Sequence, residues 1–312
     1  MSYTINAFTH PSSDGKHTLS GVVYCPLGEA KGYLQVVHGM SEHIGRYDRF
    51  MKQMAEEGYI TFGYDHLGHG RTATDKSELG YIAKNKGYVY LVDDVKLFAD
   101  AVIEKYTLEK GISGPYILMG HSMGSFVVRL TTAKHKKPDK LIIMGTGGKN
   151  PLATPGIMII SLIKAIRGGK RFSPFVQKLA FGTYNERFGE TPDDASRWLS
   201  TSQECRQKYY DDDYCGFFFT VSAMKDLVTM NRACNLGKWY KNIPKNLPIL
   251  LVSGEDDPVG NYAKGVLEVT EKLQKQNIPA RCVIYKGARH EILEDFTHND
   301  VVSDILKFVS GN

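Results

Sequence analysis

Short apolar runs alternate along the chain with amphipathic stretches, and this alternation predicts strands and helices in turn. Between residues 88 and 106, apolar side chains recur at three- and four-residue spacing with acidic ones opposite, which predicts a helix. Shorter runs of four to eight residues, rich in apolar side chains, predict strands. The predicted strands are residues 3–9, 18–25, 33–37, 59–64, 116–119, 140–144, 248–253 and 280–285.

The alternation of strands and helices stops after the sixth predicted strand and returns near residue 246. Residues 149–245 are instead rich in helix formers and aromatic side chains. We therefore expect an α/β fold built on a doubly wound, mostly parallel sheet of eight strands. Residues 1–148 and 246–312 would form its core, and residues 149–245 would form a helical cap inserted after strand 6.

The amino-acid composition agrees with this predicted fold and indicates which partners and which compartment to expect. With 312 residues, 23% charged and 42% hydrophobic, the chain has the balance of a globular protein, and its net charge of +5 indicates no nucleic-acid partner. The five cysteines form no C-x-x-C pair, which favours free thiols in a reducing compartment. The first residues lack the features of a signal peptide, so we expect a cytoplasmic protein.

A serine stands at the centre of the pentapeptide 120–124, whose sequence is Gly-His-Ser-Met-Gly. A predicted strand precedes it and a predicted helix follows it, which is the context of a G-x-S-x-G nucleophile elbow. The two glycines would leave room where strand and helix cross. The hydroxyl of Ser122 would then lie beside the first helix amides, which suit a developing oxyanion. We therefore expect Ser122 to be a catalytic nucleophile.

A base and an acid follow the serine in the chain order that this arrangement requires. His290 follows the last predicted strand, and it would take the serine proton and later return it to the leaving alcohol. We expect Asp257 to orient it, because the pattern G-x-x-D-x-V fits that residue; Asp256 is the alternative and Glu255 is less favoured. The rate should rise with the neutral imidazole, whose ordinary pKa is about 6.5.

The loop after the third predicted strand should supply the second oxyanion donor. The backbone amides of Met40 and Met123 are therefore the expected oxyanion hole, and His38 would brace this loop. Glu42 and Arg46 are four residues apart at a helix start, which predicts a salt bridge.

Two further clusters of polar residues predict no metal site. The D-H-x-x-H pattern of residues 65–69 fits no zinc motif, and the acidic run 211–213 lacks the spacing of a calcium loop. We expect both to be structural, and we expect neither a metal nor another cofactor.

Three stretches resemble motifs of the monoacylglycerol lipase and lysophospholipase branch of the α/β-hydrolases, which is of the S33 serine aminopeptidase type. Residues 38–47 resemble its HG-x-x-EH-x-x-RY signature, residues 65–70 its DH-x-GHG loop, and residues 120–124 its GHSMG elbow. In the cap, residues 198–200 look like bacterial proteins labelled lysophospholipase. The resemblance implies a serine esterase that cleaves single-acyl glycerides or lysophospholipids, with His121 contacting the alcohol part of the substrate.

The cap should determine which acyl chain is bound. Residues 157–166 form an apolar stretch followed by the basic run 167–171, and we expect this helix to pack against the core. The basic run leaves open a transient contact of the cap with a membrane surface. An apolar tunnel for the acyl chain would be lined by Ile159, Phe217, Phe218 and Phe219.

Two other functions compete with esterase activity. A proline-releasing aminopeptidase of the same fold would need cap acids to hold the substrate ammonium, and Glu186, Glu190 or residues 211–213 could supply them. A non-catalytic ligand-binding protein is disfavoured, because such a protein gains nothing from a complete set of serine, acid and histidine. The sequence leaves the oligomeric state open.

Overall fold

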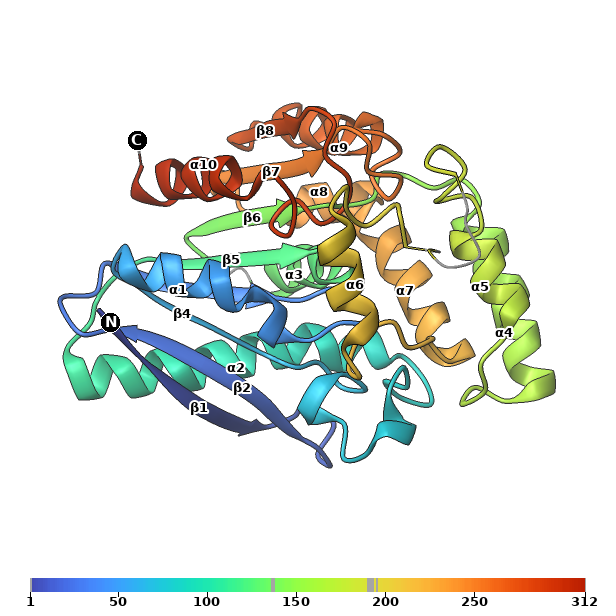
Figure 1. Ribbon diagram of the computed structural model, residues 1–312, viewed down its shortest axis with the longest axis horizontal. Helices are drawn as coiled ribbons and strands as arrows, with labels where there is room; N and C mark the ends of the chain where they lie inside the picture. The colour runs from blue at the N-terminus through green and yellow to red at the C-terminus, as the bar shows by residue number, and fades with distance from the viewer. Residues whose placement is uncertain (1, 136–137, 190–193, 195, 312) are drawn as a thin grey trace.

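Eight strands form one sheet in the computed structural model, which describes residues 2–135, 138–189, 194 and 196–311. The strand order is β1-β2-β4-β3-β5-β6-β7-β8 (Figure 1). β1 and β2 pair antiparallel, as do β2 and β4, and the remaining pairs are parallel. This arrangement confirms the predicted α/β fold. The strands are β1 (Tyr3–Pro11), β2 (Thr18–Pro26), β3 (Gly32–Val37), β4 (Tyr59–Tyr64), β5 (Tyr116–His121), β6 (Lys140–Met144), β7 (Ile249–Gly254) and β8 (Ala280–Tyr285).

The central strands are covered on both faces, and their sequences reflect this. Every residue of β3, β4, β5 and β7 is buried, which is why they are almost continuously apolar rather than alternating. The edge strand β1 instead exposes most of its side chains. All parallel strands end at the same edge of the sheet, so the loops that follow β3, β5, β6, β7 and β8 meet there.

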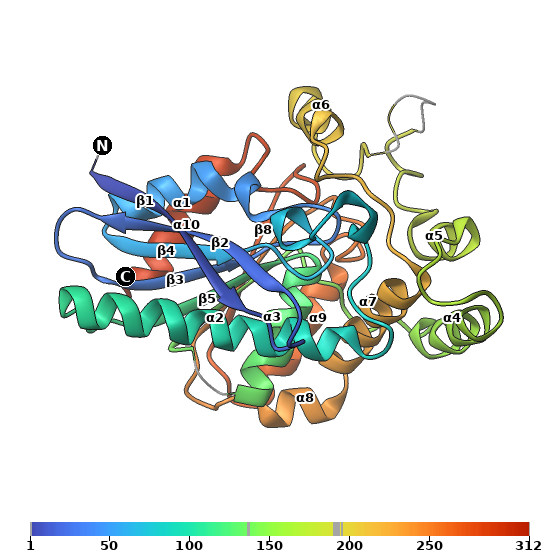
Figure 2. The ribbon, with the colours of Figure 1, turned by 90° about the horizontal axis from the view of Figure 1, so that it is seen from below.

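Helices cover the two faces of the sheet (Figure 2). Phe50 of α1 and Ile305 of α10 belong to one apolar cluster, whereas Phe98 of α2, Val127 of α3 and Val266 of α9 belong to the other. A short 3-10 turn leads into α1. These elements are that turn (Ile44–Tyr47), α1 (Asp48–Glu56), α2 (Gly87–Lys110), α3 (Met123–His135), α9 (Lys264–Gln274) and α10 (His298–Ser310).

Among the residues described between β6 and β7, five helices are present, at the place where the sequence predicts a cap. α4 and α5 stand away from the sheet, whereas α7 and α8 lie against α3 (Figures 1 and 2). In α8, the indole of Trp239 donates a 2.7 Å hydrogen bond to the carbonyl of Arg129 in α3. The division into a core and a cap at residues 149 and 245 therefore stays a proposal. The five helices are α4 (Ala153–Arg167), α5 (Pro174–Phe181), α6 (Gln203–Asp211), α7 (Val221–Cys234) and α8 (Gly237–Asn242).

The prediction that the apolar helix of the cap packs wholly against the core is wrong, because α4 packs on α7 along one side only. In α4 only Ala153 and Ile160 are buried. Met158, Leu162 and Ile166 expose 68%, 62% and 73% of their surface. The reason is that α4 contacts α7 along one side, and an apolar pattern all round a helix does not indicate which sides are covered. Within the described part of the chain, no helix combines the length and apolarity needed to cross a membrane.

Candidate active site

Ser122 occupies a strained turn between β5 and α3. Its φ angle is +53°, which side-chain-bearing residues rarely adopt. A Cβ atom on Gly120 would lie 2.4 Å from the carbonyl oxygen of Gly124, and one on Gly124 would lie 2.1 Å from that of Val37. Only glycine fits at either position, so the crossing of strand and helix requires both. The strand, strained serine and helix that the sequence predicts are all present.

Asp257 and His290 are joined by a hydrogen bond, although they come from different loops. The Nδ1 atom of His290 lies 2.9 Å from a carboxylate oxygen of Asp257, and both side chains are buried. The other oxygen of Asp257 accepts from the amide of Val259 at 2.8 Å. Glu255, in contrast, is exposed and accepts from the amide of Gly287. Asp257 is thus the acid that the structure brings to the histidine.

The loops that carry Ser122 and His290 converge at the sheet edge. Gly39, which follows β3, lies beside Ser122: a Cβ atom added to this glycine would be 3.1 Å from the Cβ atom of Ser122. Gly145, which follows β6, lies beside His290: a Cβ atom added there would be 3.1 Å from Cε1 of the imidazole. Because Nδ1 of His290 donates to Asp257, its Nε2 atom is left to accept a proton. The Ser122 hydroxyl has no hydrogen-bond partner among the described residues, and such contacts commonly tighten only when substrate binds.

The loop after β3 is held rigidly beside Ser122. The amide of Gly39 donates a 2.5 Å hydrogen bond to Glu42, so this amide is already occupied. In the described part of the chain, the amides of Met40 and Met123 have no acceptor, and both therefore stay the predicted oxyanion donors. His38 accepts from the amide of His66 at 3.0 Å and donates to the carbonyl of Gly39 at 2.8 Å, which confirms that it braces the loop.

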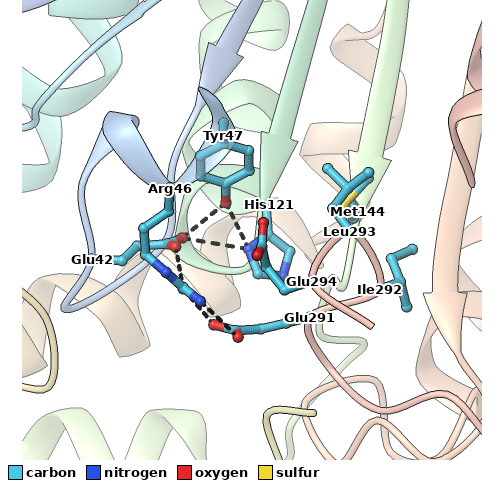
Figure 3. A pocket seen from close by; sticks show the side chains of 9 residues that line it. All are labelled: Glu42, Arg46, Tyr47, His121, Met144, Glu291, Ile292, Leu293 and Glu294. Carbon is cyan, nitrogen blue, oxygen red and sulfur yellow. Dashed lines mark hydrogen bonds and ion pairs between the residues drawn. The ribbon is translucent and has the colours of Figure 1, made fainter. Parts of the chain in front are cut away.

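A buried network of charged and polar side chains joins Glu42, Arg46, Tyr47, His121 and Glu291 (Figure 3). Arg46 forms an ion pair with Glu42 at 2.8 Å, which confirms the predicted salt bridge. It also donates two hydrogen bonds to Glu291, at 2.6 and 2.9 Å. The hydroxyl of Tyr47 donates to Glu42 at 2.9 Å and lies 2.9 Å from Nδ1 of His121. Sequence reasoning missed Tyr47 and Glu291, although their adjacency to Arg46 and His290 was the available signal.

Burial and pairing shift the pKa values in this network. Burial alone would raise the pKa of Glu42, but the hydrogen bond from His121 and the charge of Arg46 hold it well below its usual range. Burial would lower the pKa of His121, but hydrogen bonding to Glu42 and its charge raise it. Nδ1 of His121 faces the Tyr47 hydroxyl and Nε2 lies 3.3 Å from the carbonyl of His290, an arrangement that suits a doubly protonated ring.

The space enclosed by this network is not a substrate pocket. Its volume is about 10 Å³, which holds roughly one water molecule. Burial raises the pKa of Glu294, at its wall, to about 7. The lining residues are Glu42, Arg46, Tyr47, His121, Met144, Glu291, Ile292, Leu293 and Glu294 (Figure 3).

The residues predicted to bind substrate are arranged differently from the expectation. His121 is buried, and both its ring nitrogens have protein partners, so it supports the site rather than facing an alcohol. Phe217 and Phe219 pack on His69, with ring centroids 5.2 and 5.3 Å away. Phe218 is 55% exposed and stacks on Phe172.

The predicted tunnel is therefore wrong in its detail. Phe217 and Phe219 stack on each other with ring centroids 6.4 Å apart, whereas Phe218 stacks on Phe172 at 4.5 Å, so the three rings do not line one surface together. Ile159 in α4 is likewise an exposed residue.

One group of side chains has the composition of a metal site. Among the described residues, ligand atoms of His43, Asp212 and Cys215 lie within 4.8 Å of one another. His43 accepts from the amide of Gly45 at Nδ1, so its Nε2 carries the proton and donates to Asp212 at 2.8 Å. The pair is satisfied without an ion. Asp65 is structural, because it accepts from the amides of Ile44 and Arg71.

Comparison with known proteins agrees with this geometry. The chain matches the family model described as serine aminopeptidase, S33, over residues 28–297. It is 25% identical over 292 residues to a monoglyceride lipase homolog of monkeypox virus, with 91% of each chain covered. It is 26% identical over 308 residues to the monoglyceride lipase of Saccharomyces cerevisiae, covering 93% of this chain and 89% of that protein.

A solved structure extends the similarity to the whole fold. A highly thermostable carboxyl esterase from Bacillus coagulans, in complex with glycerol, superposes with a TM-score of 0.90 at 28% identity, covering 99% of this chain and 98% of that one. The family match spans most of the sequence, and the structural match includes the helices between β6 and β7. The chain therefore belongs to the serine aminopeptidase S33 family, as an α/β-hydrolase of the monoacylglycerol lipase branch, and is a serine ester hydrolase.

Proposed function

We propose that this hydrolase cleaves glycerides that carry a single acyl chain, and that it does so through an acyl-enzyme on Ser122. The observation that carries the proposal is the buried Asp257–His290 hydrogen bond of 2.9 Å, on loops that converge on the strained serine. The relatives named monoglyceride lipase support the substrate class.

The mechanism follows from these positions. His290 takes the proton of Ser122 as the serine oxygen attacks the ester carbonyl, and Asp257 stabilises the imidazolium that forms. The amides of Met40 and Met123 donate to the oxyanion. His290 then protonates the leaving glycerol, and water attacks the acyl-enzyme with His290 again as the base.

A neutral glycerol head group suits the charges around the site better than a phosphate does. Arg46 lies behind the catalytic loop, but Glu42 and Glu291 neutralise it. It is therefore not free to bind a lysophospholipid head group. Cleavage of lysophospholipids is the second outcome that a substrate panel should examine.

The acidic residues of the cap that an aminopeptidase could use to hold the substrate ammonium either contact other side chains or are exposed. Asp212 pairs with His43, and Asp213 pairs with Lys76 at 2.6 Å. Asp211 accepts from Gln207, and Glu186 is exposed. Glu190, the remaining candidate, lies outside the described residues. These contacts favour ester over aminopeptide hydrolysis.

Residues 149–245 would then act as a cap that meets the lipid phase. Leu162, Ile166, Phe175 and Leu179 expose at least half of their surface on α4 and α5. The basic residues 167, 170 and 171 follow α4 directly, so that an apolar face adjoins positive charge. This combination is typical of transient binding to an anionic membrane surface.

Fatty-acid release from a panel of monoacylglycerols and lysophospholipids, measured beside amine release from aminoacyl anilides, tests the proposal. We expect release from monoacylglycerols, and none after Ser122→Ala. Activity confined to lysophospholipids would overturn the substrate class. Amine release without ester cleavage would overturn the esterase mechanism.

A further inference from the structure

A segment of the cap runs along the loop that carries His290. The amide of His290 donates to the carbonyl of Trp198 at 3.4 Å, and the amide of Glu291 donates to that of Leu199 at 2.7 Å. These contacts join residues about 90 positions apart, with nothing in the sequence motifs to mark them. The backbone beside the candidate base is thus held by the cap as well as by the core.

Side-chain hydrogen bonds also join residues 197–201 of the cap to the loop that carries His290, on both sides of the histidine. Arg289 donates to the carbonyls of Arg197 and Ser200 at 2.6 and 3.0 Å. Asp295 accepts from the hydroxyl of Ser200 at 3.1 Å and from the amide of Thr201 at 2.7 Å. Because polar groups from both segments are satisfied by each other, separating them would expose several unpaired donors and acceptors.

The ring of Trp198 lies against the imidazole of His290. The ring centroids are 5.0 Å apart, and Tyr184 packs edge-on against the indole at 5.1 Å. The amide of Trp198 donates to Asn185 at 2.9 Å, which fixes the backbone that carries the ring. His290 is left only 2% exposed. The indole is therefore held in contact with the imidazole, where it can affect the charge on that ring.

We propose that Trp198 is a positioning residue for His290 and that it favours the imidazolium formed during ester cleavage. A positive charge within about 6 Å of an indole face is stabilised by the ring. The other groups that face the imidazole are Asp257, which favours the same charge, and His121, whose ring lies 4.7 Å away and opposes it. Trp198 thus stabilises the His290 imidazolium that forms when the proton leaves Ser122. Because this charge is absent before the reaction begins, the loss of the indole should lower kcat rather than raise KM. The inference rests on His290 being the base.

The kinetic test compares two substitutions of the same residue on a short soluble ester, p-nitrophenyl butyrate. Trp198→Leu retains bulk without a ring, and we expect kcat to fall about tenfold with KM nearly unchanged. Trp198→Phe retains a ring and should restore most of kcat. Tyr210→Leu, which removes an exposed aromatic residue of α6, is the matched control and should behave as wild type. Equal kcat for the leucine variant and wild type, or a loss confined to KM, would overturn the proposal.

A second readout needs no catalysis. Trp198 and Trp239 are the two tryptophans of the chain, and an imidazolium in contact with an indole quenches its fluorescence. We expect emission to be weaker at acid than at neutral pH, and this pH dependence to vanish in both Trp198→Phe and His290→Gln. A pH dependence that survives Trp198→Phe would contradict the ring contact. Full activity of His290→Gln would instead overturn the proposed function, so the two failures are distinguishable.

Discussion

Arg46 holds Glu291, the residue next to the proposed base, through two hydrogen bonds of 2.6 and 2.9 Å. The two residues are 245 positions apart in the chain. Both side chains are largely buried, and Arg46 also pairs with Glu42. The ion pair therefore fixes the loop that carries His290 to the loop that follows β3, so that the candidate base and one proposed oxyanion donor, Met40, share this support.

Removing Arg46 alone should lower the free energy of unfolding more than removing both Arg46 and the charge of Glu291. In Arg46→Met, Glu42 and Glu291 remain buried without their cation, and we expect the free energy of unfolding to fall by about 3–5 kcal/mol. The double variant Arg46→Met/Glu291→Gln should recover part of this loss. Urea unfolding of the four combinations measures the coupling, and strictly additive losses would contradict it.

Two substitutions of Ser122 should have the same effect on activity but different effects on stability. Ser122→Ala and Ser122→Gly both remove the nucleophile and should abolish ester cleavage. Glycine tolerates the φ of +53° whereas alanine does not, so we expect the glycine variant to be more stable than the alanine variant by about 1 kcal/mol. Thermal unfolding of the pair checks this, and equal stabilities would argue against backbone strain at the elbow.

The three acids after β7 should differ sharply in importance. Asp257→Asn should lower kcat by about 10⁴-fold, because the imidazole loses both its orientation and its stabilising charge. Asp256→Asn and Glu255→Gln are matched controls in the same loop and should retain activity. A large loss in Asp256→Asn with an active Asp257→Asn would reassign the acid.

Glu294 should make stability depend on pH. Its pKa is raised to about 7 by burial, whereas an unfolded glutamate has a pKa near 4.5. Between these values the folded protein binds more protons than the unfolded chain, so stability should fall as the pH rises from 4.5 to 7, by about 3 kcal/mol at most. Glu294→Gln should be as stable as wild type near pH 5 and more stable at pH 8.

Unfolding in urea at both pH values tests this, with Glu104→Gln as the control at an exposed glutamate. If Glu294→Gln leaves the pH dependence unchanged, Glu294 is not the group responsible.

The exposed face of the cap should matter only at a lipid interface. Leu162→Ser and Ile166→Ser should weaken binding to anionic vesicles and slow cleavage of vesicle-borne monoacylglycerol. Cleavage of soluble p-nitrophenyl butyrate should stay as in wild type. An equal loss on both substrates would mean that α4 supports the active site rather than a membrane contact.

The core of the molecule was predictable because its strands are short, apolar and ended by recognisable loops. The elbow around Ser122 is a motif of consecutive residues, and the acid and the histidine each follow a predicted strand in the chain order that the elbow requires. Asp257 could be preferred over its neighbours on the same basis.

The cap was less predictable because its arrangement depends on which neighbours are present. The apolar residues of α4 fit a buried helix and an exposed one equally well, and only the position of α7 decides between them. Phe217, Phe218 and Phe219 are identical residues, but Phe217 and Phe219 pack on His69 whereas Phe218 stacks on Phe172. The contact between Trp198 and His290 joins distant residues and has no local signature.

The pairing between residues 197–201 and the His290 loop limits how this enzyme could be re-engineered. Exchanging the insertion for one from a relative, in order to alter acyl-chain preference, would also remove the carbonyls of Trp198 and Leu199 that hold the histidine backbone. A chimera that grafts only the outer helices α4 and α5, and retains this short segment, should keep its turnover rate while its selectivity changes.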